Sequence, residues 1–128
     1  MRKKKISRKK ILIVDDDPDI VKTTKGSLEC EGYKVNTAYS GEEGLEKIKE
    51  DKPDLILLDL VLPGWSGSRT AREIRSRDEY KDIPIIVLSC KTEYLDKYVA
   101  VKSGAVAYIE KPYDMDRLFF CIRDILGS

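Results

Sequence analysis

Three carboxylates of this sequence directly follow short apolar runs. Asp15 and Asp16 come after the run at residues 11–14, and Asp59 comes after the run at residues 55–58. Short apolar runs bounded by turn-forming residues are typical of strands that are covered on both faces of a parallel sheet. If these strands are neighbours, their carboxyl ends bring together three carboxylates, which cannot all stay ionised without a cation. Such oxygen ligands suit Mg²⁺, which prefers one or two protein carboxylates together with water and phosphate.

A hydroxyl and an ammonium group are predicted at the same edge of the sheet. Ser89 ends the apolar run at residues 83–89, and Lys111 follows the run at residues 107–110. Beside a metal-bound carboxylate, these are the groups that a phosphoryl group requires around it. Each residue also has a purely structural interpretation, as a helix-start acid, a strand-end hydroxyl or a surface lysine. Their occurrence together at four strand ends favours a phosphoryl–magnesium site, and the lack of a glycine-rich phosphate loop argues against a nucleotide.

Strands and helices are expected to alternate along the chain. Strands are predicted at residues 11–14, 33–39, 55–58, 83–89 and 107–110, and helices at residues 18–30, 40–50, 67–77, 94–103 and 115–126. Asp17 and Asp114 are predicted N-caps, Pro18 fits a first helical position, and Ser40 with Glu43 forms a capping box. The predicted fold class is α/β, a single doubly wound five-stranded parallel sheet with strand order 2-1-3-4-5 and five helices.

Composition indicates one soluble globular domain. The chain has 128 residues, of which 41% are hydrophobic and 37% charged. No apolar run approaches the ~20 residues of a membrane span, and no apolar core follows the basic N-terminus as a signal peptide requires. The three cysteines lack metal-ligand spacing and the chain has no histidine. Reduced thiols in a cytoplasmic protein are therefore expected, with no membrane association.

The charges are unevenly distributed. Residues 1–10 contain seven of the 24 basic residues and no acid, so the remainder carries 17 basic against 23 acidic residues, a net charge of −6. Residues 1–9 are predicted to form a basic, solvated tail in front of a domain at residues 10–128. Binding of the tail to nucleic acid or an acidic lipid surface is the alternative, although no aromatic residue interrupts the tail to stack on bases. Direct nucleic-acid binding by the domain itself is not expected.

Four motifs carry a resemblance to a known family. In chain order they are ILIVDDDP, LILLDLVLPGWSG, IIVLSCK and GAVAYIEKP. With this order and spacing, residues 10–126 resemble the receiver domains of two-component response regulators, the chemotaxis-regulator-like family. The resemblance implies a flavodoxin-like fold and a cytoplasmic phosphoprotein of a phosphorelay. It also implies that the domain is no enzyme toward other substrates and catalyses only its own phosphorylation and dephosphorylation.

The resemblance assigns a role to each residue of the predicted site. Asp59 would accept a phosphoryl group from the phosphohistidine of a sensor histidine kinase or phosphotransfer protein. Magnesium would be held by Asp16, Asp59 and the backbone carbonyl of Val61, with Asp15 acting mainly through water. Lys111 would form an ion pair with the phosphoryl oxygens.

The resemblance also implies a switch. Ser89 would hydrogen-bond to the phosphoryl group, and Tyr108 would turn inward once Ser89 moves. The face made by the fourth helix, the fifth strand and the fifth helix would then bind a downstream protein, an output domain or a second phosphorylated copy. Departures from the family pattern at Trp65, Ser66 and Cys90 affect the shape of the loops and the identity of the partner rather than the chemistry.

Two other classes remain as alternatives. Asp15 and Asp17 are spaced like the nucleophile motif of haloacid-dehalogenase-like phosphatases, but that interpretation lacks a downstream acidic pair and leaves Asp59 unexplained. A phosphorylation-independent interaction module is the second alternative. Receiver domains of that kind typically lose an acid or the lysine, whereas this chain has both.

Overall fold

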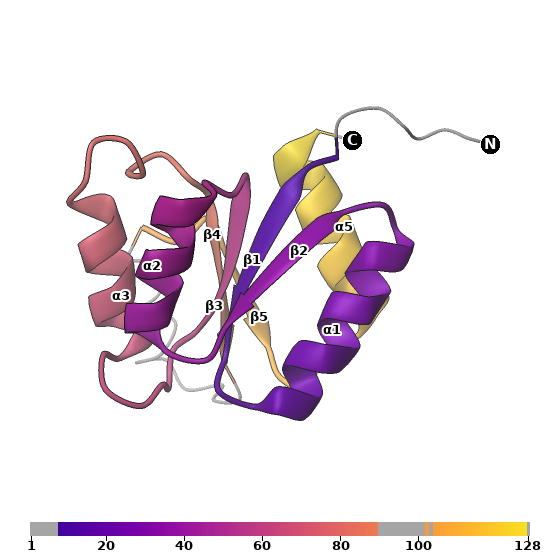
Figure 1. Ribbon diagram of the computed structural model, residues 1–128. Coiled ribbons are helices and arrows are strands. Elements are labelled where there is room, and N and C mark those ends of the chain that lie inside the picture. Colours follow the sequence, from indigo (N-terminus) through magenta and orange to yellow (C-terminus); the bar gives the residue numbers. More distant parts are fainter. Residues whose placement is uncertain (1–7, 90–101, 103, 128) are drawn as a thin grey trace.

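A five-stranded parallel sheet forms the middle layer of the molecule (Figure 1). The structure, a computed structural model, describes residues 8–89, 102 and 104–127. The strands are β1 (Lys10–Val14), β2 (Lys34–Ala38), β3 (Leu55–Asp59), β4 (Ile85–Ser89) and β5 (Ala107–Glu110). They are arranged in the order β2-β1-β3-β4-β5, and all neighbours are parallel. The predicted sheet and its strand order are confirmed.

Helices cover both faces of the sheet. They are α1 (Pro18–Cys30), α2 (Gly41–Glu50), α3 (Gly67–Arg75) and α5 (Met115–Leu126). In Figure 1, α1 and α5 lie on one face, and α2 and α3 lie on the other. The predicted helix at residues 94–103 lies outside the described residues, apart from Lys102, which is helical. The same holds for residues 1–7 of the predicted basic tail. None of the helices in the described ranges is long and apolar enough to cross a membrane.

Local sequence sets where three of these helices begin. The side chain of Asp17 accepts hydrogen bonds from the amides of Asp19 and Ile20, with Pro18 as the first residue of α1. Ser40 Oγ accepts from the amide of Glu43 at the start of α2, and Glu43 Oε1 accepts in return from the amide of Tyr39. Asp114 caps α5 in the same way as Asp17 caps α1. These side chains satisfy amides that have no partner within the helix, so the predicted caps are confirmed.

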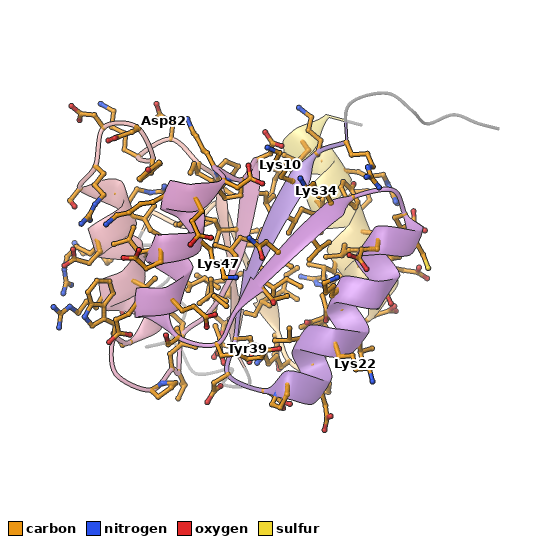
Figure 2. The ribbon with its side chains drawn as sticks, in the orientation of Figure 1. Lys10, Lys22, Lys34, Tyr39, Lys47 and Asp82 are labelled. Carbon is orange, nitrogen blue, oxygen red and sulfur yellow. The ribbon has the colours of Figure 1, made fainter. Side chains whose placement is uncertain are left out.

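Two apolar layers flank the sheet. One packs alternate residues of β1, β3 and β4 against α2 and α3, and the other packs the intervening residues against α1 and α5. All five residues of β3 are buried, as are all five of β4. Because both faces of these strands are covered, every side chain is apolar until the strand reaches its carboxyl end. Polar residues that follow the strands therefore gather at one edge, on the side of Tyr39 and opposite to Lys10 and Lys34 in Figure 2.

Candidate functional site

Asp59 is the last residue of the central strand, and its side chain is almost completely buried. The residue is 6% exposed, and its Oδ1 accepts a hydrogen bond of 3.2 Å from the amide of Val61. The loop that follows is closed where the amide of Gly67 donates to the carbonyl of Leu60. A Cβ atom on Gly67 would lie 2.3 Å from the carbonyl oxygen of Asp59, so only glycine allows this approach. The first residue of α3 thus packs directly against the end of β3.

Asp15 and Asp16 come from the neighbouring strand. Val14 pairs with Leu58, which places the residues after β1 beside Asp59. Asp15 is fully buried and accepts a hydrogen bond of 3.0 Å from the amide of Asp17, whereas Asp16 is exposed. One carboxylate oxygen from each of Asp15, Asp16 and Asp59 lies within 4.8 Å of the others. The structure thus brings together the three carboxylates that the sequence pattern predicts.

Lys111 joins this cluster from the turn that follows β5. Its Nζ donates to Asp15 Oδ2 at 2.7 Å and to Asp59 Oδ2 at 3.3 Å, and its side chain is 10% exposed. The amide of Lys111 donates to the carbonyl of Ser89 at 2.6 Å, which fixes the start of the turn after β5. The Lys111–Pro112 peptide bond in this turn is cis. Lys111 therefore contacts two of the carboxylates while its backbone is held by β4.

Burial and charge shift the pKa values of this pair. Burial raises the pKa of Asp59 to about 6; the charge of Lys111 opposes that rise and the charge of Asp15 adds to it. For Lys111, burial alone would lower the pKa, but the hydrogen bond to Asp15 and the charges of both carboxylates outweigh it and raise the pKa. When all groups are ionised, three carboxylates face one ammonium, an excess of two negative charges. This donor set, all carboxylate oxygen and short of positive charge, fits a hard divalent cation.

The remaining predicted residues lie around this cluster. Ser89 is fully buried as the last residue of β4, the strand next to β3. Tyr108 is half-buried in β5, where it pairs with Val87 and packs against the apolar layer on the side of α2 and α3. Val61 follows β3, and the residue is 61% exposed. All the predicted site residues thus lie at or near the carboxyl edge, on the four neighbouring strands β1, β3, β4 and β5 and the loops after them.

One buried polar contact beside the site could not be predicted from the sequence. Thr24 of α1 and Tyr113, two residues after Lys111, are joined by a hydrogen bond of 2.8 Å between their hydroxyl groups. Thr24 fits the apolar stripe of its helix, and Tyr113 follows a turn, so neither is conspicuous in the sequence. The two residues are 89 positions apart in the sequence, and only the tertiary fold brings them together.

The fold and site together define a doubly wound α/β protein with an acidic cluster at the carboxyl edge of its sheet. A family model described as the response regulator receiver domain matches residues 11–123. The chain belongs to this family, the receiver domains of two-component response regulators. The match favours the receiver interpretation over the phosphatase alternative.

Solved structures of such proteins agree closely. A receiver domain protein from Methanospirillum hungatei JF-1 is 34% identical, covering 94% of this chain and 95% of that chain, with a TM-score of 0.88. A response regulator from Chloroflexus aurantiacus J-10-fl is 31% identical, covering 95% and 100%, with a TM-score of 0.90. The receiver domain of a sensor histidine kinase from Pseudomonas aeruginosa PAO1 is 27% identical, covering 95% and 100%, with a TM-score of 0.88. That last structure contains a magnesium ion coordinated in its active site cleft.

Proposed function

We propose that Asp59 accepts a phosphoryl group from the phosphohistidine of a sensor histidine kinase or phosphotransfer protein, in a reaction that depends on Mg²⁺. The observation that carries this proposal is the contact of Lys111 with both Asp15 and Asp59 inside a cluster of three carboxylates. A carboxylate oxygen of Asp59 forms the new O–P bond as the N–P bond breaks. The imidazole of the donor leaves with the electron pair of that bond.

Each residue of the site has a separate role in the proposed transfer. Since the pKa of Asp59 is about 6, its carboxylate form predominates above that pH and is available as the nucleophile. The Nζ of Lys111, which contacts Asp59, pairs with the phosphoryl oxygens, and the Ser89 hydroxyl donates a hydrogen bond to them. Asp15, Asp16, Asp59 and the backbone carbonyl of Val61 are the proposed holders of the magnesium ion. Bound there, the ion supplies positive charge toward the phosphoryl oxygens.

The chemistry is confined to the chain itself. The domain catalyses its own phosphorylation, and its own dephosphorylation when water attacks the acyl phosphate and releases inorganic phosphate. Residues 10–128 form this receiver unit, and residues 1–9 form a basic tail in front of it. We propose a cytoplasmic location, where reduced cysteines and the phosphohistidine donor are expected.

Phosphorylation is proposed to act as a switch. A phosphoryl group adds charge and strong acceptor oxygens, which draw the Ser89 hydroxyl and Lys111 toward them. Tyr108 then moves toward the vacated space and changes the face made by the fourth helix, β5 and α5. This face binds a downstream protein or output domain, or a second phosphorylated copy of the chain. The fourth helix itself lies outside the described residues.

Phosphorylation of Asp59 is tested with a small phosphodonor. With acetyl phosphate and Mg²⁺, intact-mass spectrometry should detect one phosphoryl group on the wild-type chain and none on Asp59→Asn. Asp78→Asn, whose side chain is 98% exposed, is the matched control and should be labelled like the wild type. If Asp59→Asn is labelled and Asp15→Asn is not, the nucleophile is the phosphatase-like aspartate and the proposal is wrong.

A further inference from the structure

The hydrogen bond between Thr24 and Tyr113 connects α1 to the turn that carries Lys111. The two hydroxyl oxygens are 2.8 Å apart, and Thr24 is only 2% exposed. Tyr113 is separated from Lys111 by Pro112 alone, a residue that contributes no amide hydrogen bond. The backbone on the amino side of Lys111 is held by Ser89, through the carbonyl that accepts from the Lys111 amide. Tyr113 is the corresponding attachment on the carboxyl side of the turn.

The packing around Tyr113 leaves its ring dependent on the hydroxyl group to hold it in place. An open groove of about 280 Å³ lies between α1 and the turn, and its lining includes Tyr113 and Thr24 together with Ile20, Lys111 and Pro112. A ring that borders an open groove on one side is not fixed by packing alone, because no protein atoms hold it on that side. The hydrogen bond to Thr24 supplies the missing restraint. It joins the turn to the middle of a 13-residue helix, which is a rigid support.

We propose that Tyr113 is a positioning residue for Lys111, and that its hydroxyl, anchored on Thr24, sets the rate at which Asp59 is phosphorylated. This proposal rests on the proposed function of Asp59. Loss of the hydroxyl allows the turn to shift, and Lys111 Nζ then no longer lies where it contacts both Asp15 and Asp59. Because charge pairing at a reacting group depends steeply on geometry, a small displacement of Lys111 slows the transfer without removing any ligand.

The electrostatics of the site are consistent with this role. Burial raises the pKa of Tyr113, so the hydroxyl stays protonated and able to hydrogen-bond at neutral pH. The hydrogen bond with Thr24 and the charge of Lys111 oppose this rise in pKa, and the charges of Asp15 and Asp59 add to it.

The test compares phosphorylation rates of variants that all retain Asp59. Tyr113→Phe and Thr24→Val each remove one partner of the hydrogen bond with little change in shape. Each should slow labelling by acetyl phosphate about fivefold, the equivalent of one net hydrogen bond. The double variant should be no slower than the slower single variant, since both remove the same contact. Tyr33→Phe, which removes the same atom from a partly buried tyrosine on this side of the sheet, is the matched control and should keep the wild-type rate.

A second background separates positioning from general destabilisation. In Lys111→Ala, the Tyr113→Phe substitution should change the rate of labelling by less than about twofold, because the group that it positions is gone. A further fivefold loss in that background, or an unchanged rate for Tyr113→Phe alone, would overturn the proposal. Failure of the proposed function has a different signature, since the wild-type chain would then take up no phosphoryl group on Asp59 at all.

Discussion

At the scale of single residues, Asp59 shows how the fold makes a carboxylate reactive. Its charge is buried at the end of an apolar strand, which is unfavourable unless a cation compensates it. Lys111 compensates in part, but it also serves Asp15, so one ammonium is shared between two buried carboxylates. The raised pKa of Asp59 is the result. Burial that destabilises the ionised form also leaves that form basic and poorly solvated, as suits a nucleophile.

Asp59 is expected to weaken the fold as the pH rises. Its pKa of about 6 in the folded chain lies above the ordinary value of 3.8, so the protonated form is the one that folding favours. The stability it contributes is fully present below about pH 4 and is lost as the pH rises through 6. In the absence of Mg²⁺, Asp59→Asn should therefore gain up to ~3 kcal/mol relative to the wild type between pH 4 and pH 7. Urea denaturation across this range measures the difference.

Asp78→Asn is the control for this pH series, because its carboxylate is exposed and should give a pH dependence close to that of the wild type. A gain in unfolding free energy for Asp59→Asn that is the same at pH 4 and pH 7 would contradict the expected ionisation.

The site residues themselves could be predicted from the sequence, since Asp15, Asp59, Ser89 and Lys111 all stand at the ends of apolar runs. Their pairing could not, because the contact of Lys111 with both Asp15 and Asp59 depends on tertiary distances that no local pattern encodes.

At the scale of elements, the strands were predictable because both of their faces are buried. The predicted and observed elements differ at their ends. The predicted strand at residues 83–89 begins at Ile85, because Pro84 has no amide to donate, although its carbonyl still accepts from Ile56. The predicted helix at residues 67–77 ends at Arg75. There the Arg75 guanidinium donates to the carbonyls of Ile83 and Gly104, contacts that draw it toward β4 and that the sequence does not indicate.

The junction of β3 and α3 should be intolerant of even one added carbon. On Gly67, a Cβ atom would lie 2.3 Å from the carbonyl oxygen of Asp59 and 2.6 Å from the Cα of Leu60, and backbone atoms cannot move aside cheaply. Gly67→Ala should cost about 1–3 kcal/mol of unfolding free energy. It should also slow phosphorylation, since the strain falls on Asp59. Thermal or urea unfolding, together with labelling by acetyl phosphate, measures both effects.

The same substitution elsewhere gives the control. Gly26 is exposed in the middle of α1, and a Cβ atom there would meet nothing within 4 Å. Gly26→Ala should stabilise the chain by about 1 kcal/mol, because alanine is the better helix former. If Gly67→Ala lowers the free energy of unfolding and Gly26→Ala raises it, the loss at Gly67 comes from the close approach of its Cβ atom to the backbone of Asp59 and Leu60. A neutral Gly67→Ala would show that the loop after β3 adjusts without cost.

At the scale of the whole molecule, the cluster of Asp15, Asp16 and Asp59 links cation binding to the stability of the fold. The three carboxylates converge only when β1 and β3 are paired, so a cation that they bind stabilises the folded chain and not the unfolded one. Such a cation also removes the electrostatic repulsion among the three carboxylates.

Magnesium should therefore raise the melting temperature. At about ten times its dissociation constant, one ion bound to the folded state adds about 1.4 kcal/mol. Asp16→Asn should abolish the response, whereas Glu46→Gln, which changes an exposed acid on α2, should keep it. Sodium chloride at matched ionic strength controls for general screening. A melting temperature that does not respond to Mg²⁺ in the wild type would refute the metal site.

The complete burial of β3 has a consequence for hydrogen exchange. The strand lies between β1 and β4, and none of its five residues reaches solvent appreciably. Amide protons in such a strand exchange with deuterium only when the molecule opens globally, whereas those of β2, with four partly or fully exposed residues at the edge, exchange through local fraying. Asp59 therefore terminates one of the two fully buried inner strands, β3 and β4, in which exchange should be slowest among the described residues. The protection factors of Leu57 and Leu58 should report the global free energy of unfolding, so a charge added to or removed from Asp59 should alter exchange along the whole strand.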